Sequence, residues 1–273
     1  MIGLQDKTAI VTGGSSGIGQ AIAVRLANEG VNVAINYVGP PEGAVMTKDE
    51  IERGFDSCMC SMRDAGLAPL LVEADVSKED QVAQMFAKTV DHFGGVDILI
   101  NNAGIQISGD SETLAIGDFD KVLAVNLRGS FLCAQQALQH MLATQKMGSI
   151  VNVSSVHQEI PKPRFLGYSV SKGGMQNLTR SLALEYAGRG IRVNAVAPGA
   201  TITPINRAWV DDPEKAAMVV SHIPMGRAGT AAEMAAVSAF LCSDEAAYIT
   251  GQTIFVDGGL TLFADFRTTW SSE

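Results

Sequence analysis

Basic residues, cysteines and long apolar runs are all scarce in this chain of 273 residues. The 20 lysines and arginines are outnumbered by 29 aspartates and glutamates, which gives a net charge of −9. Proteins that bind nucleic acid or anionic membranes need a basic face instead, so neither partner is expected. No apolar run reaches the ~20 residues that cross a bilayer. The first apolar run starts by Lys7, which leaves no room for a signal peptide. We therefore expect a cytoplasmic protein.

The four cysteines are Cys58, Cys60, Cys133 and Cys242. A single Cys-x-Cys pair with no further cysteine or histidine nearby is a poor zinc site, so no metal is expected. Cytoplasmic thiols stay reduced. The cysteines are therefore predicted to be free and buried.

Short apolar runs alternate with helical patterns along most of the chain, without a repeat or a low-complexity linker. Runs that are apolar on both faces suit a parallel sheet covered by helices on both sides. The pattern predicts an α/β fold in one domain, residues 1–273, with a doubly wound parallel seven-stranded sheet. The predicted strands are Thr8–Thr12, Val31–Asn36, Ala68–Glu73, Val96–Asn101, Ser149–Ser154, Arg192–Ala197 and Gln252–Val256.

Capping boxes mark where three of the predicted helices start. They are Thr47-x-x-Glu50, Thr230-x-x-Glu233 and the weaker Ser77-x-x-Asp80.

A glycine-rich turn joins the first predicted strand to a helix from about Ile18 to Asn28. Gly13, Gly17 and Gly19 lie in it. The pyrophosphate of a dinucleotide needs bare backbone N–H groups at a helix N-terminus, and glycines allow this approach. The spacing G-x-x-x-G-x-G departs from the general G-x-G-x-x-G fingerprint, so the turn alone is weak support for a nucleotide site.

Ser155, Tyr168 and Lys172 form a second constellation. Ser155 directly follows a predicted strand, at the sheet edge where open parallel sheets bind ligands. Tyr168 and Lys172 are four residues apart and share a helix face, so the ammonium can favour the ionised phenol. A phenol with a pKa near ~10 is otherwise a poor base at neutral pH.

Taken together, these motifs resemble the short-chain dehydrogenase/reductase family. They are TGGSSGIG (residues 12–19), NNAG (residues 101–104), Asn126, Ser155, Tyr168, Lys172 and Pro198-Gly199, and the likeness runs from Lys7 to Gly259. The resemblance implies a Rossmann fold that binds NAD or NADP, and a homotetramer. It implies that Ser155 polarises the reacting oxygen, Tyr168 is the acid/base, and Lys172 lowers the tyrosine pKa and holds the nicotinamide ribose. Asn126 would place a water that passes protons to Lys172.

The same resemblance implies which residues contact the cofactor. They are Gly13, Ser15, Ser16, Gly17, Ile18, Gly19, Tyr37, Asp75, Val76, Asn102, Ala103, Gly104, Tyr168, Lys172, Pro198, Gly199, Thr201 and Thr203. The choice between NAD and NADP stays open, because Tyr37 and Val38 end the second strand where an acidic residue would mark NAD and an arginine NADP. NAD is slightly favoured, since no basic residue immediately follows the strand. Lys48 and Arg53 lie further along, in a long segment from Gly39 to Gly66.

Within the family, the chain is most similar to bacterial glucose 1-dehydrogenases. The likeness rests on residues 154–163, 168–175, 182–194, 198–206 and 223–227 and on the ending DGGLTLF. It implies a sugar substrate bound by Gln106, Ser155, His157, Tyr168 and Asn206. After NNAG those relatives carry a glutamate, whereas this chain has Ile105-Gln106, and the lost carboxylate leaves the choice of sugar open.

The first alternative to a sugar dehydrogenase is a 3-oxoacyl-(acyl-carrier-protein) reductase or another ketone or alcohol reductase of the same family, and the second is a non-catalytic nucleotide sensor. The acidic composition disfavours the first, and the complete set of Ser155, Tyr168 and Lys172 disfavours the second.

Two features of the sequence itself also favour a tetramer. The segments Phe119 to Leu142 and Gly167 to Tyr186 carry apolar residues on more than one face. The last predicted strand would form a sheet edge that needs cover.

Overall fold

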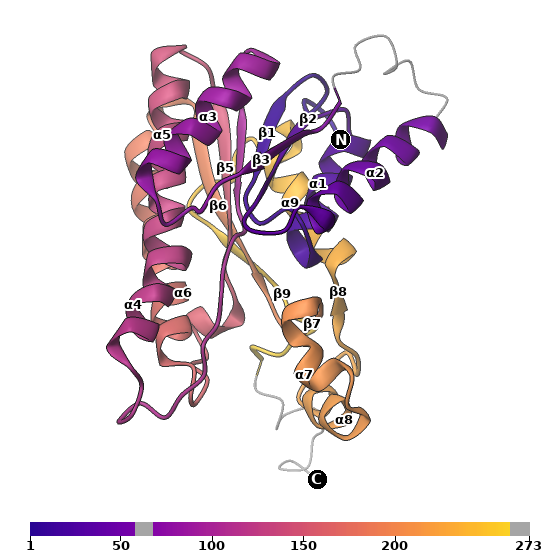
Figure 1. Ribbon diagram of the computed structural model, residues 1–273, viewed down its shortest axis with the longest axis vertical. Coiled ribbons are helices and arrows are strands. Elements are labelled where there is room, and N and C mark those ends of the chain that lie inside the picture. The colour runs from indigo at the N-terminus through magenta and orange to yellow at the C-terminus, as the bar shows by residue number, and fades with distance from the viewer. Residues whose placement is uncertain (58–67, 263–273) are drawn as a thin grey trace.

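The centre of the protein is a parallel sheet of seven strands. The computed structural model describes residues 1–57 and 68–262 and orders the strands β3-β2-β1-β4-β5-β6-β9 (Figure 1). Each predicted strand is present, with ends within two residues of the prediction. The strands are β1 (Thr8–Val11), β2 (Asn32–Tyr37), β3 (Leu70–Glu73), β4 (Ile98–Asn101), β5 (Gly148–Val153), β6 (Ile191–Pro198) and β9 (Thr253–Val256). The predicted doubly wound fold is confirmed.

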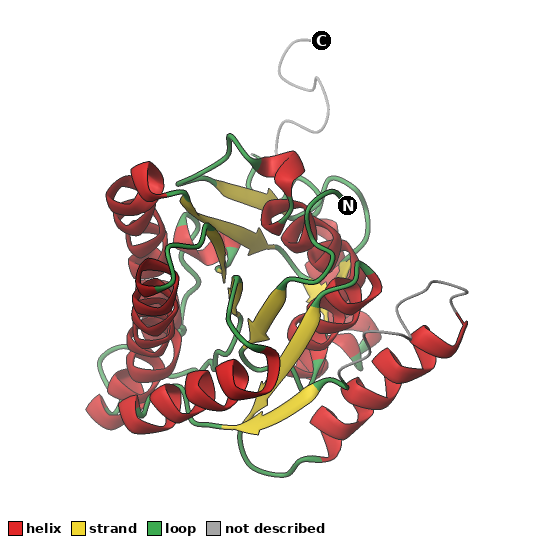
Figure 2. Ribbon diagram, turned by 90° about the horizontal axis from the view of Figure 1, so that it is seen from above, coloured by secondary structure: helices red, strands yellow, loops and turns green. Residues whose placement is uncertain are grey.

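Helices cover both faces of this sheet, as Figure 2 shows from above. One face carries α1 (Gly17–Asn28), α2 (Glu42–Ser57) and α9 (Ala231–Cys242). The other carries α3 (Glu79–Phe93), α5 (Ser130–Ala143) and α6 (Leu166–Tyr186), with α4 (Ile116–Leu123) against α6. Two separate apolar cores result, one on each side of the sheet.

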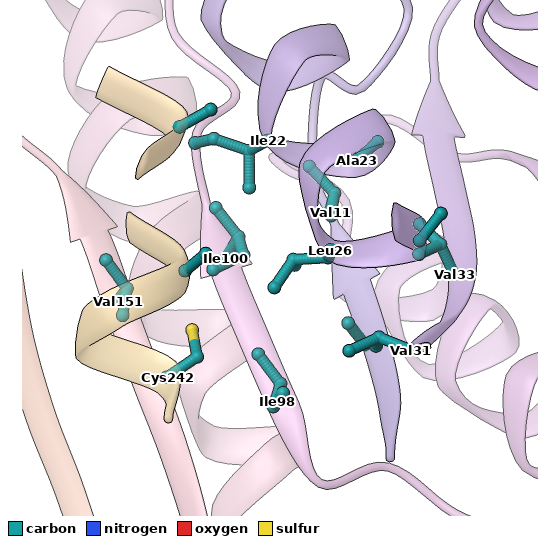
Figure 3. Packing of buried hydrophobic residues seen from close by; sticks show 14 of the residues in the cluster. Val11, Ile22, Ala23, Leu26, Val31, Val33, Ile98, Ile100, Val151 and Cys242 are labelled. Carbon is teal, nitrogen blue, oxygen red and sulfur yellow. The ribbon is translucent and has the colours of Figure 1, made fainter. Parts of the chain in front are cut away.

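Consecutive residues of the central strands enter opposite cores. Val11 belongs to the core under α1 and α9, and its neighbour Ile10 to the core under α3 and α5. Figure 3 shows the first core, where Ile22 and Leu26 of α1 pack with the strands and with Cys242 of α9. Burial on both faces explains why the strands read as continuous apolar runs rather than as alternating ones.

Two of the three helix starts predicted from capping boxes are wrong. Helix α2 begins at Glu42, and Thr47 is buried inside it, where its Oγ1 donates to the Gly43 and Gly14 carbonyls at 3.0 and 3.1 Å. Helix α3 begins at Glu79, and Ser77 instead donates its N–H to Asp75.

The third helix start is confirmed. Thr230 Oγ1 accepts from the Glu233 N–H at 3.3 Å, and the Glu233 carboxylate accepts from the Thr230 N–H at 2.8 Å.

A π-helical turn, η2 (Ala124–Gly129), joins α4 to α5 into one helical stretch. Such a turn holds one extra residue compared with an α-helical turn. It contains Asn126, which is fully buried.

Several short elements between β6 and β9 were not predicted. They are β7 (Thr201–Ile202), the 3₁₀ turn η5 (Pro204–Asn206), α7 (Arg207–Val210), α8 (Pro213–Ser221) and β8 (Gly229–Thr230). Figure 1 shows α7 and α8 beyond the lower end of the sheet, apart from the main helix layers. Strand β7 pairs with β8 in a small separate sheet.

The remaining sequence expectations can be compared only over the described part of the chain. There, no helix combines the length and apolarity needed to cross a membrane. Residues able to hold a metal do not cluster in that part either. Cys133 and Cys242 are free, and burial raises the pKa of each thiol to about 12. Cys58 and Cys60 lie outside the described residues.

Candidate active site

A cavity of about 460 Å³ lies at the carboxyl ends of the strands. Its lining comes from the loops after β1, β4, β5 and β6 and from the start of α6. Within the described residues, the lining contains no aspartate or glutamate, although the whole chain carries a net charge of −9. A wall without carboxylates suits an anionic ligand such as a pyrophosphate, since no like charge opposes it. The predicted site residues in the lining are Gly13, Ser15, Ser16, Gly17, Ile18, Asn102, Ala103, Gly104, Gln106, Ser155, His157, Tyr168, Lys172, Pro198, Gly199, Thr201, Thr203 and Asn206.

Steric constraints explain why positions 13, 17 and 19 of the first turn are glycines. Gly13 and Gly17 have φ values of 61° and 57°, a left-handed conformation that residues with a Cβ seldom adopt. A Cβ on Gly19 would lie 2.3 Å from the Gly13 carbonyl oxygen, so only glycine lets α1 approach the turn this closely. The spacing G-x-x-x-G-x-G therefore fits a phosphate-binding turn that leads into a helix.

Polar side chains fix this turn to its neighbouring strands. Thr12 Oγ1 accepts from the Asn102 N–H at 2.9 Å, and Asn102 Nδ2 donates to the Thr12 and Gly13 carbonyls at 2.9 and 3.1 Å. On the other side, Asn36 Oδ1 accepts from the Gly13 N–H at 3.2 Å. Thr12 and Asn36 were not among the predicted site residues. Their signal in the sequence is a polar residue at the end of an apolar strand.

The three predicted catalytic side chains meet on one wall of the cavity. Ser155 follows β5 and accepts the His157 N–H at 3.1 Å. Its hydroxyl also forms a hydrogen bond with Tyr168. The buried Lys172 donates from Nζ to the Val153 carbonyl at 2.7 Å, and this Nζ lies 5.5 Å from the centre of the Tyr168 ring.

Burial controls the protonation of this group. It raises the pKa of Tyr168, and the hydrogen bond from Ser155, which lowers that pKa, is the smaller cause. It also lowers the pKa of Lys172 from 10.5 to about 8. Desolvation of the phenolate is thus the largest influence on the pKa of Tyr168, and the predicted lowering of that pKa by Lys172 stays a prediction.

Asn126 lies behind the cavity rather than in its wall. Its Oδ1 accepts from the Ile105 N–H at 2.8 Å, and its Nδ2 donates to the Ile105 carbonyl at 2.9 Å and to Ser171 Oγ at 3.1 Å. The side chain thus holds the segment after NNAG against α6. The predicted role in placing a water stays a prediction.

Three predicted substrate contacts, Gln106, His157 and Asn206, line the cavity. Gln106 Nε2 donates to the Ile205 carbonyl at 3.3 Å and links two loops. Asn206 Nδ2 donates to the Thr201 carbonyl at 2.8 Å and holds the turn that contains it. Asn206 Nδ2 also donates to Thr203 Oγ1 at 3.3 Å, so both of its hydrogens are used and its carbonyl oxygen is the group left for a substrate, whereas Gln106 keeps one N–H and its carbonyl oxygen.

Tyr37, Asp75, Val76 and Gly19 lie outside the cavity lining. The Asp75 carboxylate accepts the Ser77 N–H at 2.9 Å, which is a structural reason for an aspartate there. The cofactor contacts expected of Tyr37, Asp75 and Val76 stay predictions.

One side of the cavity was not predicted. It comes from the loop before α6, from the irregular segment after β6 and from the turn after β9, and its residues are Lys162, Ile205, Trp209, Val219, His222 and Leu260. Lys162 Nζ lies 4.2 Å from the centre of the Phe165 ring. Trp209, Val219 and His222 lie in no motif of the sequence, and the stretches that contain Lys162, Ile205 and Leu260 gave no signal that these side chains reach the cavity.

Comparison with known proteins identifies the family. The family model described as "Enoyl-(Acyl carrier protein) reductase" matches residues 13–261. The chain belongs to the short-chain dehydrogenase/reductase family. It is therefore an oxidoreductase that uses NAD or NADP.

Members with different substrates are similarly related to this chain. Glucose 1-dehydrogenase of Gluconobacter oxydans (strain 621H) is 47% identical over 266 residues, which cover 97% of this chain and 96% of the relative. The 3beta-hydroxysteroid dehydrogenase 1 of Eggerthella lenta is also 47% identical, over 97% of both chains. The 3-oxoacyl-(acyl-carrier-protein) reductase of Staphylococcus aureus (strain Mu50) is 41% identical over 93% of this chain and 98% of the relative.

Solved structures of family members have the same fold. Levodione reductase matches with a TM-score of 0.86 and 36% identity, over 94% of this chain and 98% of that one. A gluconate 5-dehydrogenase from Burkholderia cenocepacia, in complex with NADP and tartrate, matches with a TM-score of 0.83 and 34% identity over 96% of both chains.

Proposed function

We propose that this oxidoreductase oxidises the anomeric hydroxyl of an aldose such as β-D-glucose, giving the lactone. Overall identity does not separate sugar from steroid, since relatives named for each are 47% identical to this chain. The observation that carries the proposal is the polar wall beside the catalytic serine, where Gln106, His157 and Asn206 line the cavity together. A sugar presents several hydroxyls at once, and such a wall can satisfy them.

The catalytic side chains suit removal of a hydroxyl proton. Tyr168, as the phenolate, takes the proton from the substrate oxygen. Ser155 accepts the N–H of His157, so its own hydroxyl proton can be donated to Tyr168 or to the substrate oxygen. A bound nicotinamide would supply the hydride acceptor, and the positive charge of its oxidised form would favour the Tyr168 phenolate against the effect of burial.

NAD is the proposed cofactor of choice over NADP. From Tyr37 to Thr47, the end of β2 and the start of α2 contain one charged residue, Glu42. The next two cations after this stretch are engaged elsewhere, because Lys48 pairs with Glu52 at 3.6 Å and Arg53 Nε donates to the Asp49 carbonyl at 3.1 Å. Neither interaction places a positive charge at the end of β2, where a 2′-phosphate would need one.

A homotetramer in the cytoplasm remains part of the proposal. An apolar depression on the outer side of the η2 turn, α5 and α6 supports association with a second copy of this chain. Leu127, Phe131 and Leu178 line it, and Phe131 is 41% exposed. An exposed aromatic residue among leucines is typical of surfaces that are buried between subunits.

The substrate proposal is tested with a panel of aldoses and both oxidised cofactors, by following the absorbance of the reduced nicotinamide. Rapid oxidation of glucose supports it. Failure with every aldose, together with rapid reduction of an acetoacetyl thioester, would instead assign the protein to carrier-protein reduction.

A further inference from the structure

The hydrogen bond between His157 and Ile160 determines which ring nitrogen carries the proton. His157 Nδ1 lies 2.8 Å from the Ile160 carbonyl oxygen. A carbonyl oxygen can only accept, so Nδ1 must carry the hydrogen. In the neutral ring, Nε2 is then a bare acceptor that faces away from Ile160. Within the described residues, this nitrogen has no hydrogen-bond partner in the protein.

The surroundings of the ring favour its neutral form. Burial is the largest cause that lowers the pKa of His157, and the charge of Lys162 lowers it further. The hydrogen bond to Ile160 raises the pKa of His157, but this effect is smaller than that of burial. Among the described residues, the charge that acts on the pKa of His157 is that of Lys162 on the same loop, and the ring of Tyr168 on α6 packs edge-on at 6.1 Å between centroids. Neither is an anion at neutral pH, so no counter-charge favours the imidazolium.

The His157 ring lines the cavity, close to where the reacting oxygen must sit. That oxygen has to contact both Ser155 and Tyr168, and His157 is two residues from the first and in ring contact with the second. A hydroxyl on the carbon next to the reacting carbon can therefore reach His157 while the chemistry takes place at Tyr168.

We infer that His157 Nε2 accepts a hydrogen bond from a second hydroxyl on the substrate, so that the site selects sugars and other compounds with hydroxyls on neighbouring carbons. This rests on the proposed function and narrows it, because the neighbouring hydroxyl is required as a donor. An isolated ring alcohol or a β-keto thioester has no such donor and leaves Nε2 unsatisfied in the cavity wall.

The first experiment compares substrates that differ only in this donor. Glucose is set against 2-deoxyglucose and 2-deoxy-2-fluoroglucose, because fluorine occupies the position of the hydroxyl but cannot donate. In parallel, trans-cyclohexanediol with neighbouring hydroxyls is set against cyclohexanol. The wild-type protein should lose about tenfold in kcat/KM, mostly through KM, whenever the donor is absent. Equal turnover within both pairs overturns the inference.

The second experiment attributes this preference to His157. In His157→Ala the ratio of kcat/KM for glucose to kcat/KM for 2-deoxyglucose should fall to about one. The 2-hydroxyl has then lost its partner, so removing the hydroxyl from the substrate should cost nothing further, as in a double-mutant cycle. His157→Gln places an amide oxygen near the position of Nε2 and should restore most of the ratio. His157→Asn places its amide near Nδ1, keeps only the bond to Ile160, and should not restore it. A ratio that survives in the alanine variant, or returns equally in both amides, overturns the inference.

The two proposals fail in different ways. Wild-type protein that oxidises no aldose but still prefers the diol to cyclohexanol refutes the sugar proposal and supports the role of His157. Wild-type protein that oxidises glucose and 2-deoxyglucose equally refutes the role of His157 and leaves aldose oxidation standing.

Discussion

Replacing Lys172 with methionine should abolish activity while leaving the folded protein at least as stable at neutral pH. Burial lowers the pKa of this lysine from 10.5 to about 8. At ~1.4 kcal/mol per pKa unit, the buried charge opposes folding by roughly 3 kcal/mol at neutral pH. Methionine keeps the unbranched stem but leaves the Val153 carbonyl without its 2.7 Å donor. That loss costs about 1–3 kcal/mol, so the net change lies between about zero and a gain of about 2 kcal/mol.

The sharper test is how the stability difference depends on pH. The lysine pKa is lower in the folded than in the unfolded chain, so the unfolded chain binds more protons between the two values. Wild-type stability therefore rises with pH from about 8 toward 10.5 through this group. The variant lacks this contribution, and all other groups cancel in the difference. Its advantage over wild type should shrink by about 2 kcal/mol between about pH 7 and about pH 9.5.

Urea unfolding at one fixed protein concentration, without cofactor, measures this difference at each pH. Lys88→Met on the exposed side of α3 is the matched control and should show no such trend. Turnover of Lys172→Met should fall at least 100-fold, within the range of about 10²–10⁴ for groups that assist proton transfer. Cofactor affinity should also fall. A stability difference that does not change with pH would refute the reasoning.

Three further predictions concern catalysis, cofactor and assembly. Tyr168→Phe should fold and bind cofactor normally but lose about 10²–10⁴-fold in turnover, and a variant with activity within a few-fold of wild type would contradict the role of the phenol. The rate of oxidation by the wild-type protein should rise with pH, because burial raises the tyrosine pKa. The kcat/KM with NAD should exceed that with NADP by about tenfold, far less than the 10⁴-fold of a dedicated polar pocket. Glu42→Gln should bring this ratio closer to one. Strict use of NADP would overturn the preference for NAD. Phe131→Asp should shift sedimentation from a tetramer to smaller species, and a wild-type monomer at micromolar concentration would refute the tetramer.

The strands could be predicted because the central ones are buried on both faces, and each apolar run starts and stops within two residues of the observed ends. Helix starts were harder. Thr47 fits a capping box by spacing, but its hydroxyl instead donates to Gly14 and Gly43 because α2 packs on the cofactor turn. Local patterns cannot show that a threonine is engaged by a segment more than 30 residues away.

The cofactor side of the site could be predicted because its residues occur in motifs, and family resemblance places each motif at a strand end. The opposite side of the cavity could not be predicted from the sequence. Trp209, Val219 and Leu260 reach the cavity from short, irregular elements whose position depends on tertiary packing. Asn126 was predicted, but its bonds to Ile105 and Ser171 were not, because they join segments far apart in the chain.

The π-helical turn at Ala124–Gly129 has a consequence for how the surface of this long helix is arranged. Each residue of an α-helix advances about 100° around the axis, so one extra residue rotates all later side chains by about that angle relative to the earlier ones. The apolar stripes of α4 and α5 are thus out of phase in the sequence and yet face their respective neighbours in the fold. The apolar residues on more than one face between Phe119 and Leu142 arise partly from this rotation. Deleting a single residue from the turn would make the helix regular, but it would turn one of the two stripes away from its partner.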